Sequence, residues 1–164
     1  MRISIRIAKS QDVIGFFMPR TFHFSLDRRI TNWVIKILLK FDLAPEIYYL
    51  LTVQGRKSGR PHSVPIVLVE EGGKRWLVAP YGVVDWVKNA RAAGQIRLSR
   101  RKLDEQFTVL ELSPEAAAPI LKKYLQQYPI TGPYFGANLE SPLSEFIEDA
   151  QTRPVFELKP LTDK

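Results

Sequence analysis

The sequence predicts a small α+β barrel, a fold in which short strands and helices follow one another in mixed order. The chain has 164 residues, 45% of them hydrophobic and 25% charged, which suits one buried core and is too short for two. Between residues 48 and 158 the sequence contains five or six short strand-like runs separated by turns and helices. This mixed order favours a barrel over a doubly wound parallel sheet.

The strand predictions depend on aromatic and β-branched residues and on the turns between them. A Gly72-Gly73 pair joins the second and third runs and indicates a hairpin. Pro65 indicates that the second strand begins at a sheet edge or carries a bulge. The expected strands are 48–54, 63–69, 75–79, 95–99, 106–112 and 155–158.

Three helices are expected within the barrel region. The first covers 85–93, with Asp85 as its N-cap and Gly94 as its stop. The second begins after Ser113 as N-cap and runs to about Tyr128. A loop rich in Pro and Gly covers 129–140, and a third helix covers 142–150.

We divide the chain into an N-terminal amphipathic helical segment, 1–44, and a barrel domain, 45–164. Residues 27–41 place apolar side chains at helical spacing and cations on the other faces. Such a helix most often packs its apolar stripe on its own domain, although it also suits an anionic membrane surface. Because no secretory signal is recognised, we expect a cytoplasmic protein, with the inner face of the cell membrane as a second location.

Composition excludes several classes of site. The chain has no cysteine, which rules out disulfides, thiolate nucleophiles and Cys-type metal sites. His23 and His62 lie too far apart in sequence for a zinc motif, so we expect no metal. No apolar run reaches the ~18 residues that a membrane span needs.

The net charge of +7 is unevenly distributed along the chain. Residues 51–102 carry 11 Lys and Arg against 3 Asp and Glu, whereas residues 103–164 carry 5 against 10. This asymmetry indicates a localised anionic partner, such as a small-molecule phosphate, nucleic acid or an anionic membrane. The alternative is a basic face that only contacts solvent.

Two segments carry candidate chemistry. Residues 55–60, GRKSGR, combine glycines with Arg56, Lys57, Ser58 and Arg60, which are residue types that bind oxyanions. The segment is neither a P-loop nor a Rossmann fingerprint, and a basic hairpin tip would look the same. Residues 79–94, APYGVVDWVKNARAAG, place a tight turn before a helix N-terminus, which suits an anionic or planar ligand. The alternative is that Trp86 belongs to the core and Asn89 caps a neighbouring segment.

The run LLTVQGRKSGRPHSVPIVLVEEGGKRWLVAPYG followed by DWVKNARAAG resembles the deazaflavin-dependent nitroreductase and quinone reductase family. The resemblance covers about residues 45–160. It implies a split β-barrel of the FMN-binding type with flanking helices, and coenzyme F420 as cofactor. It also implies hydride transfer from reduced F420 to a quinone or a similar electron-poor acceptor, and nitroaromatics or enones as adventitious substrates.

The resemblance implies roles for particular residues. Those matched to coenzyme contacts are Arg56, Lys57, Ser58 and Arg60 in the loop, Ala79, Pro80, Tyr81 and Gly82 in the turn, and Trp86, Asn89 and Arg91 in the helix. Tyr134 and Tyr128 fall where the family's substrate-side tyrosines lie and are the candidates for supplying a proton. The Ala93-Gly94 pair departs from the Asn-Pro that often follows the family's helix.

Three alternatives remain at this point. An FMN-binding barrel would need fewer cations than the loop offers, because FMN carries one phosphate. A non-catalytic barrel could bind a lipid or another hydrophobic ligand. Nucleic-acid binding is permitted by the sequence pI of about 9.7, but no nucleic-acid motif accompanies it.

Overall fold

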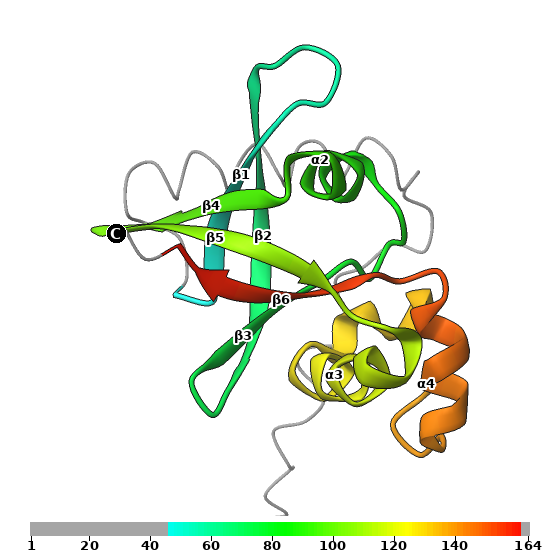
Figure 1. The fold of residues 1–164 in the computed structure, drawn as a ribbon. Coiled ribbons are helices and arrows are strands. Elements are labelled where there is room, and N and C mark those ends of the chain that lie inside the picture. The colour runs from blue at the N-terminus through cyan, green and yellow to red at the C-terminus, as the bar shows by residue number, and fades with distance from the viewer. Residues whose placement is uncertain (1–45, 162–164) are drawn as a thin grey trace, which may run out of the picture.

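The computed structural model describes residues 46–161, which form a closed six-stranded antiparallel barrel with flanking helices. The strand order around the barrel is β1-β2-β3-β6-β5-β4 (Figure 1). This architecture confirms the predicted split β-barrel. The strands are β1 (Tyr48–Gln54), β2 (Pro61–Glu71), β3 (Lys74–Val78), β4 (Gln95–Arg100), β5 (Leu103–Glu111) and β6 (Val155–Pro160).

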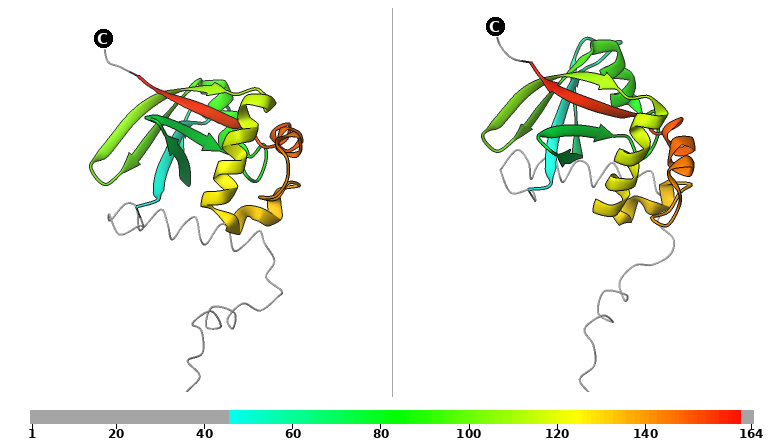
Figure 2. Two further views of the ribbon diagram at one scale, coloured as in Figure 1. Left: turned by 90° about the horizontal axis from the view of Figure 1, so that it is seen from below. Right: turned by 60° about the horizontal axis from the view of Figure 1, so that its bottom comes forward.

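The helices lie outside the barrel in two groups. Helix α2 (Asp85–Ala93) lies beside the loop between β1 and β2, at one end of the barrel. Helix α3 (Pro114–Gln127), the 3-10 helix η1 (Pro129–Tyr134) and α4 (Leu143–Ala150) gather at another side of the barrel (Figure 2). The two groups are joined through β4 and β5.

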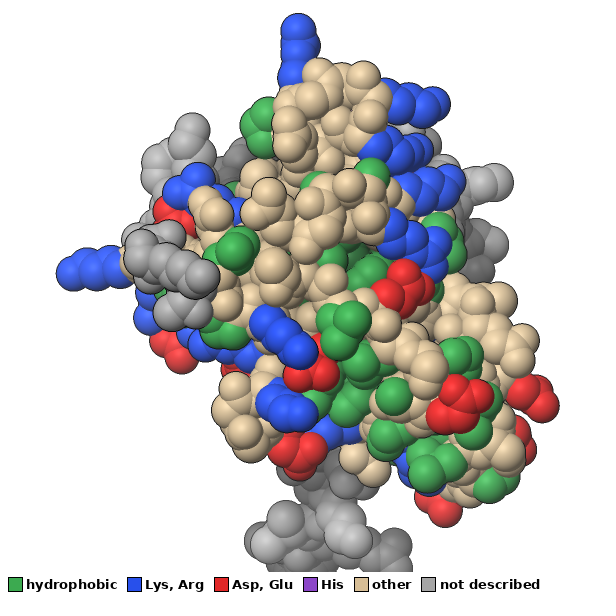
Figure 3. Space-filling model, viewed as in Figure 1, with side chains coloured by type: hydrophobic (Ala, Val, Ile, Leu, Met, Phe, Trp, Pro, Cys, Tyr) green, Lys and Arg blue, Asp and Glu red, His purple; other side chains and the backbone are tan. Residues whose placement is uncertain are grey.

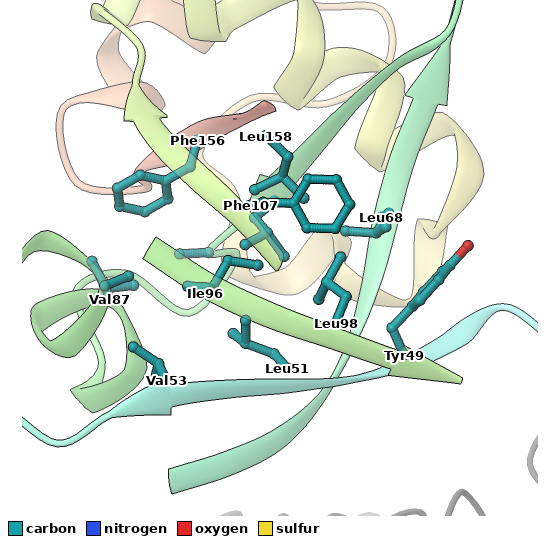
Figure 4. Packing of buried hydrophobic residues seen from close by; sticks show 13 residues of the cluster. Tyr49, Leu51, Val53, Leu68, Val87, Ile96, Leu98, Phe107, Phe156 and Leu158 are labelled. Carbon is teal, nitrogen blue, oxygen red and sulfur yellow. The ribbon is translucent and has the colours of Figure 1, made fainter. Parts of the chain in front are cut away.

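The fold has two hydrophobic clusters, one inside the barrel and one outside it, because successive side chains of a strand point to opposite faces of the sheet. In β1 the buried positions are Tyr49, Leu51 and Val53, and the intervening side chains are more exposed. These residues point into the barrel, where they meet Leu98 and Phe107 (Figure 4). The second cluster lies between the outer face of β2, β3 and β6 and the helices α3 and α4.

Strand β2 changes its partner midway along its length. Residues 61–67 pair with β1, and residues 68–71 pair with β3. Pro65 lies in the first half, opposite Leu50 of β1, where no second ladder requires its missing N–H. At Pro65 the strand is therefore paired on one side only, as at a sheet edge, but β2 begins four residues earlier, at Pro61. The hairpin that follows turns at Gly72 and Gly73, whose φ angles are 57° and 76°.

Several predicted boundaries need correction. Asp85 is not the N-cap of α2: Val84 is, with extended backbone, and Asp85 is the first helical residue. The Asp85 carboxylate turns to Arg56 instead. Strand β5 begins at Leu103, three residues earlier than predicted, and residues 129–134 form η1 within the predicted loop. The expected segments 1–44 and 27–41 lie outside the described residues.

Two of the three predicted helix caps, Ser113 before α3 and Gly94 after α2, are confirmed. The Ser113 side chain accepts a hydrogen bond from the backbone N–H of Ala116 at 3.4 Å. Gly94 ends α2 with a left-handed φ of 68°, and its N–H donates to the carbonyl of Ala90. Helix α2 therefore ends at Ala93, and its side chains Asp85 and Asn89 contact Arg56 of the β1–β2 loop.

Candidate functional site

The loop between β1 and β2 is a closed turn at the tip of a rigid hairpin. The Gly55 N–H donates to the carbonyl of Arg60, and the Gly59 N–H donates to the carbonyl of Gly55, both at 2.8 Å. Gly55 is buried, and a Cβ there would lie 2.7 Å from Cδ2 of His62. A side chain at position 55 would have to displace the His62 ring and the Ser58 hydroxyl, which pack against this glycine in a compact basic loop.

Arg56 anchors this loop to helix α2. Its Nη1 and its backbone N–H both donate to Oδ1 of Asn89, at 2.8 and 3.3 Å. Its Nη2 pairs with the carboxylate of Asp85 at 3.3 Å. Asn89 is 5% exposed, so its amide oxygen is buried and its hydrogen bonds are specific. The structure therefore brings Arg56 and Asn89 together, as the resemblance implied for two parts of one site.

The remaining polar residues of the loop face solvent. The Ser58 hydroxyl accepts from the Arg60 N–H at 3.3 Å and lies 3.5 Å from Nε2 of His62. Lys57 and Arg60 are exposed, as is Lys88 of α2. Within residues 46–161 no carboxylate forms a salt bridge with any of these three cations. Their charge is available to an external anion.

The surface divides by charge. Lys and Arg side chains gather over the β1–β2 loop and α2, along the upper right margin of Figure 3. Asp and Glu side chains gather over α3 and α4 at the lower right of the same view. Four cations at the loop and α2, namely Arg56, Lys57, Arg60 and Lys88, face a single nearby carboxylate, Asp85. The N-terminal end of α2 adds partial positive charge to the same region.

The turn at residues 79–82 leads from β3 into α2. Ala79 and Pro80 are buried, and the Gly82 N–H donates to the carbonyl of Ala79 at 3.0 Å with a φ of 80° at Gly82. Tyr81 is 46% exposed. Because Asp85 follows this turn by three residues and pairs with Arg56, the turn and the basic loop lie at the same end of α2.

Tyr134 of η1 meets this turn from a distant part of the sequence. Its ring contacts the ring of Tyr81 edge-on, with centroids 4.7 Å apart and an angle of 87° between the planes. The structure thus brings Tyr134 to the predicted coenzyme turn. An aromatic pair made of an exposed Tyr81 and a half-buried Tyr134, next to a basic loop, suits a ligand that joins a flat ring to an anionic tail.

Tyr128 occupies a different environment. Its hydroxyl donates to the carbonyl of Leu68 in β2 at 3.0 Å, and its ring packs on Tyr124. Burial is the main cause of a raised pKa for the Tyr128 hydroxyl. The hydrogen bond to a strand carbonyl gives Tyr128 a structural role in fixing the end of α3 to the barrel.

Two predicted helix residues are not directed at the basic loop by any described contact. Trp86 is half-buried and packs on the barrel core, with its ring centroid 6.0 Å from that of Phe156. Arg91 forms a two-point ion pair with Glu111 of β5, with nitrogen–oxygen distances of 2.7 and 2.8 Å. The charge of Arg91 is therefore balanced within the described fold.

Three further residues belong to this region and escaped sequence reasoning. Lys88 lies one turn before Arg91 in α2, and helical spacing could have indicated it. His62 packs against Gly55 and Ser58 of the same hairpin. Asp85 joins the site through a tertiary contact with Arg56, for which the sequence carries no local signal. Residues 46–161 contain no cluster of three His, Asp or Glu side chains arranged to hold a metal ion. Nor does that part of the chain contain a helix long and apolar enough to cross a bilayer.

Comparison with known proteins agrees with this geometry. A profile of the F420H(2)-dependent quinone reductase family matches residues 28–134. The fold is similar to the solved F420-H2 dependent reductase FDR-A, with 26% identity and a TM-score of 0.53, over 70% of this chain and 95% of that chain. No curated protein matches the sequence.

More distant solved structures share the fold alone. A conserved hypothetical protein from Mycobacterium tuberculosis has 12% identity and a TM-score of 0.53, over 77% of this chain and 79% of that one. A putative pyridoxamine 5'-phosphate oxidase from Listeria innocua has 10% identity and a TM-score of 0.50, over 79% and 92%. Because the matching family profile covers well over half of the sequence, the chain belongs to the F420H(2)-dependent quinone reductase family, and its class of activity is F420-dependent oxidoreduction.

Proposed function

We propose that this protein reduces a quinone with reduced coenzyme F420, bound across the β1–β2 loop, the N-terminal end of α2 and the turn at 79–82. The observation that carries the proposal is the local surplus of positive charge beside an exposed aromatic turn. Four cations face one carboxylate, and three of the four have no acidic partner in residues 46–161. F420 carries a phosphodiester and a glutamate tail, so this donor set fits it.

Each part of the site has a distinct task in this proposal. Arg56, Lys57, Ser58 and Arg60 bind the phosphodiester and the acidic tail, and Asn89 orients Arg56 through the hydrogen bond at 2.8 Å. The turn residues, Ala79 to Gly82, lie along the ring system. Trp86 supports α2 from the core, and Arg91 fixes the helix to β5 through Glu111. Lys88 adds a further cation that the sequence analysis did not name.

The chemistry requires little from the protein beyond binding, orientation and one proton. Reduced F420, when bound, supplies a hydride to the acceptor. A quinone that gains one hydride and one proton becomes the hydroquinone, so electrons and atoms balance. We assign the proton transfer to the Tyr134 hydroxyl or to water beside it, because Tyr134 lies against Tyr81 at the turn. The Tyr128 hydroxyl already donates to Leu68 and is the weaker candidate.

The test is anaerobic mixing of the purified protein with reduced F420 and a soluble menaquinone analogue. We expect the visible absorbance of the oxidised coenzyme to return, with one coenzyme oxidised per quinone reduced. Nitroaromatic and enone acceptors, assayed in parallel, rank the acceptor classes. Absence of both coenzyme oxidation and coenzyme binding would falsify the proposal.

Binding titrations separate the competing ligands. Affinity for FMN above that for F420, or a purified protein with a flavin spectrum, would favour the FMN-binding alternative. A lipid recovered by organic extraction, together with no affinity for F420, would favour a non-catalytic barrel. Retention on DNA that falls steeply with salt would support nucleic-acid binding.

Contact with an anionic membrane is a separate part of the proposal. A lipid-soluble quinone resides in the bilayer, and the basic amphipathic segment 27–41 is the candidate for reaching it. We expect the full chain to sediment with vesicles that contain anionic lipid, and a variant with Lys36 and Lys40 changed to Glu to remain in solution. Equal sedimentation of the two proteins would contradict the proposed membrane contact and would leave the reductase proposal unaffected.

A further inference from the structure

The segment 149–154, which comprises the last two residues of α4 and the turn to β6, contacts both aromatic parts of the candidate site. It is far in sequence from the basic loop and from the turn at 79–82. The Ala79 N–H donates to the carbonyl of Pro154 at 3.0 Å, which fixes the beginning of the coenzyme turn. A Cβ at Gly82 would lie 3.3 Å from the carbonyl oxygen of Thr152, so the end of that turn also packs against this segment.

Asp149 binds the backbone of the segment that follows Tyr134. Its carboxylate is buried, with the residue 6% exposed, and accepts hydrogen bonds from the backbone N–H groups of Gly136 and Ala137 at 3.0 to 3.1 Å. A buried carboxylate is retained in a fold when such donors satisfy it. Asp149 thereby fixes the chain immediately after η1, the helix that ends at Tyr134.

Arg153 connects this carboxylate to Tyr134 itself. Its Nη1 donates to Oδ1 of Asp149 at 2.7 Å, and its Nη2 donates to the backbone carbonyl of Tyr134. The guanidinium also lies over the Phe135 ring, 5.3 Å from the centroid. Among the described residues nothing accepts from its Nε, so the two terminal nitrogens orient the group. The planar fork of arginine is needed to reach two acceptors at once.

We propose that Asp149 and Arg153 are positioning residues for acceptor reduction: they hold Tyr134 edge-on against Tyr81 and so set the place of the acceptor above the coenzyme ring. This inference rests on the proposed function. One short turn fixes Tyr81 through Ala79 and Gly82, and fixes Tyr134 through its own carbonyl. The two rings, 53 positions apart in the chain, therefore share one support for their 4.7 Å contact.

The first arm of the test needs no coenzyme. Hydrogen exchange of peptides covering 129–140 is measured for the full chain and for three variants, Asp149→Asn, Arg153→Gln and Arg153→Lys. Loss of the carboxylate charge in Asp149→Asn should accelerate exchange at Gly136 and Ala137, whose N–H groups bond to it. Arg75→Gln is the matched control, because Arg75 is likewise a half-buried arginine that reaches two acceptors, the carboxylates of Glu70 and Glu105, but it lies on β3 away from this turn.

The second arm separates positioning from general stability. Arg153→Lys keeps a cation beside Asp149 but cannot also reach the Tyr134 carbonyl. At a temperature where every variant is folded, we expect its kcat/KM for the quinone analogue to fall on the order of 10- to 100-fold. The Kd for the coenzyme and the protection of Gly136 and Ala137 should change little. Tyr134→Ala tests whether Arg153 acts through Tyr134. In the Tyr134→Ala background, Arg153→Lys should lower kcat/KM almost no further.

Each outcome decides between the alternatives. Independent, multiplying losses in the double variant would overturn the inference, as would wild-type turnover in Arg153→Lys and Arg153→Gln. Exchange at 136–137 that Asp149→Asn leaves unchanged would also overturn it. If the wild-type protein neither binds nor oxidises reduced F420, the proposed function fails instead, while the exchange arm still decides whether this turn supports the Tyr134 segment. If Asp149→Asn does not fold, the two Arg153 variants carry the test.

Discussion

The guanidinium of Arg56 and the side-chain amide of Asn89 are joined across 33 positions of sequence, with Nη1 2.8 Å from Oδ1. The same oxygen also accepts the backbone N–H of Arg56. This pair closes the gap between the basic loop and α2. It holds a cation in place through a neutral partner, so the positive charge of Arg56 is oriented without being cancelled by Asn89.

Replacing Asn89 should therefore weaken coenzyme binding without removing any charge. In Asn89→Ala the Arg56 N–H and guanidinium lose their shared acceptor, and we expect unfolding to become easier by about 1–3 kcal/mol. The Kd for reduced F420, measured by titration, should rise. Asp85→Asn is the matched control: it removes the carboxylate near Arg56 and should lower the Kd. Weaker binding in Asp85→Asn would contradict an electrostatic role for the loop.

The loop cations can be tested directly. Arg56→Ala combined with Lys57→Ala should weaken coenzyme binding by roughly 2–5 kcal/mol, from about 1.5–3 kcal/mol for each charge-assisted hydrogen bond with incomplete additivity. Arg97→Ala is the control, because Arg97 is an exposed cation paired with Asp104 on the β4–β5 hairpin. Affinity should also fall as salt is added, since the cations are exposed. Unchanged affinity in the double variant would place the binding site elsewhere.

The two candidate tyrosines should separate by the quantity that each affects. Tyr134→Phe should lower kcat for quinone reduction more than it raises the coenzyme Kd, because the ring stays against Tyr81 while the hydroxyl is lost. Tyr128→Phe should instead lower the free energy of unfolding by about 0.5–1.5 kcal/mol, because the hydrogen bond to Leu68 is lost. Stopped-flow turnover and urea unfolding measure the two effects. Equal losses of kcat and affinity in Tyr134→Phe would make that hydroxyl structural.

Buried tyrosines predict a loss of stability at high pH. Burial raises the pKa of Tyr124, which is 4% exposed, and that of Tyr128. A raised folded-state pKa gives stabilisation that is complete below the unfolded pKa of about 10 and is lost as pH rises through the folded value. Each such tyrosine should lower the free energy of unfolding by up to about 1.4 kcal/mol per pH unit in that window.

Urea unfolding at a series of pH values above about 9 measures this slope. Tyr124→Phe should make the alkaline slope shallower, since it removes one titrating group that must ionise on unfolding. Val155→Ala is the control, because Val155 is fully buried in the same cluster and does not titrate. It should lower stability equally at every pH. An alkaline slope that Tyr124→Phe leaves unchanged would contradict the assigned cause.

Local patterns were sufficient to predict the barrel and the chain segments of the site. Alternation in residues 48–54, the Gly72-Gly73 pair and the Ser113 and Gly94 caps depend on interactions within a few residues, and the structure confirms them. The basic loop and the turn at 79–82 were likewise evident, because clustered cations and tight turns are properties of short segments. The role of Asp85 was predicted wrongly because its partner, Arg56, lies 29 positions away.

The sequence by itself determined the barrel, the family and the segments that carry the basic charge. Only the tertiary structure decided which side chains share a contact: Arg56 with Asn89, Arg91 with Glu111, and Tyr134 with Tyr81. The physical reason is that charge and periodicity are summed along a local stretch of chain. Pairing through a buried hydrogen bond or a ring edge depends instead on positions set by the closed barrel and the turn at 149–154.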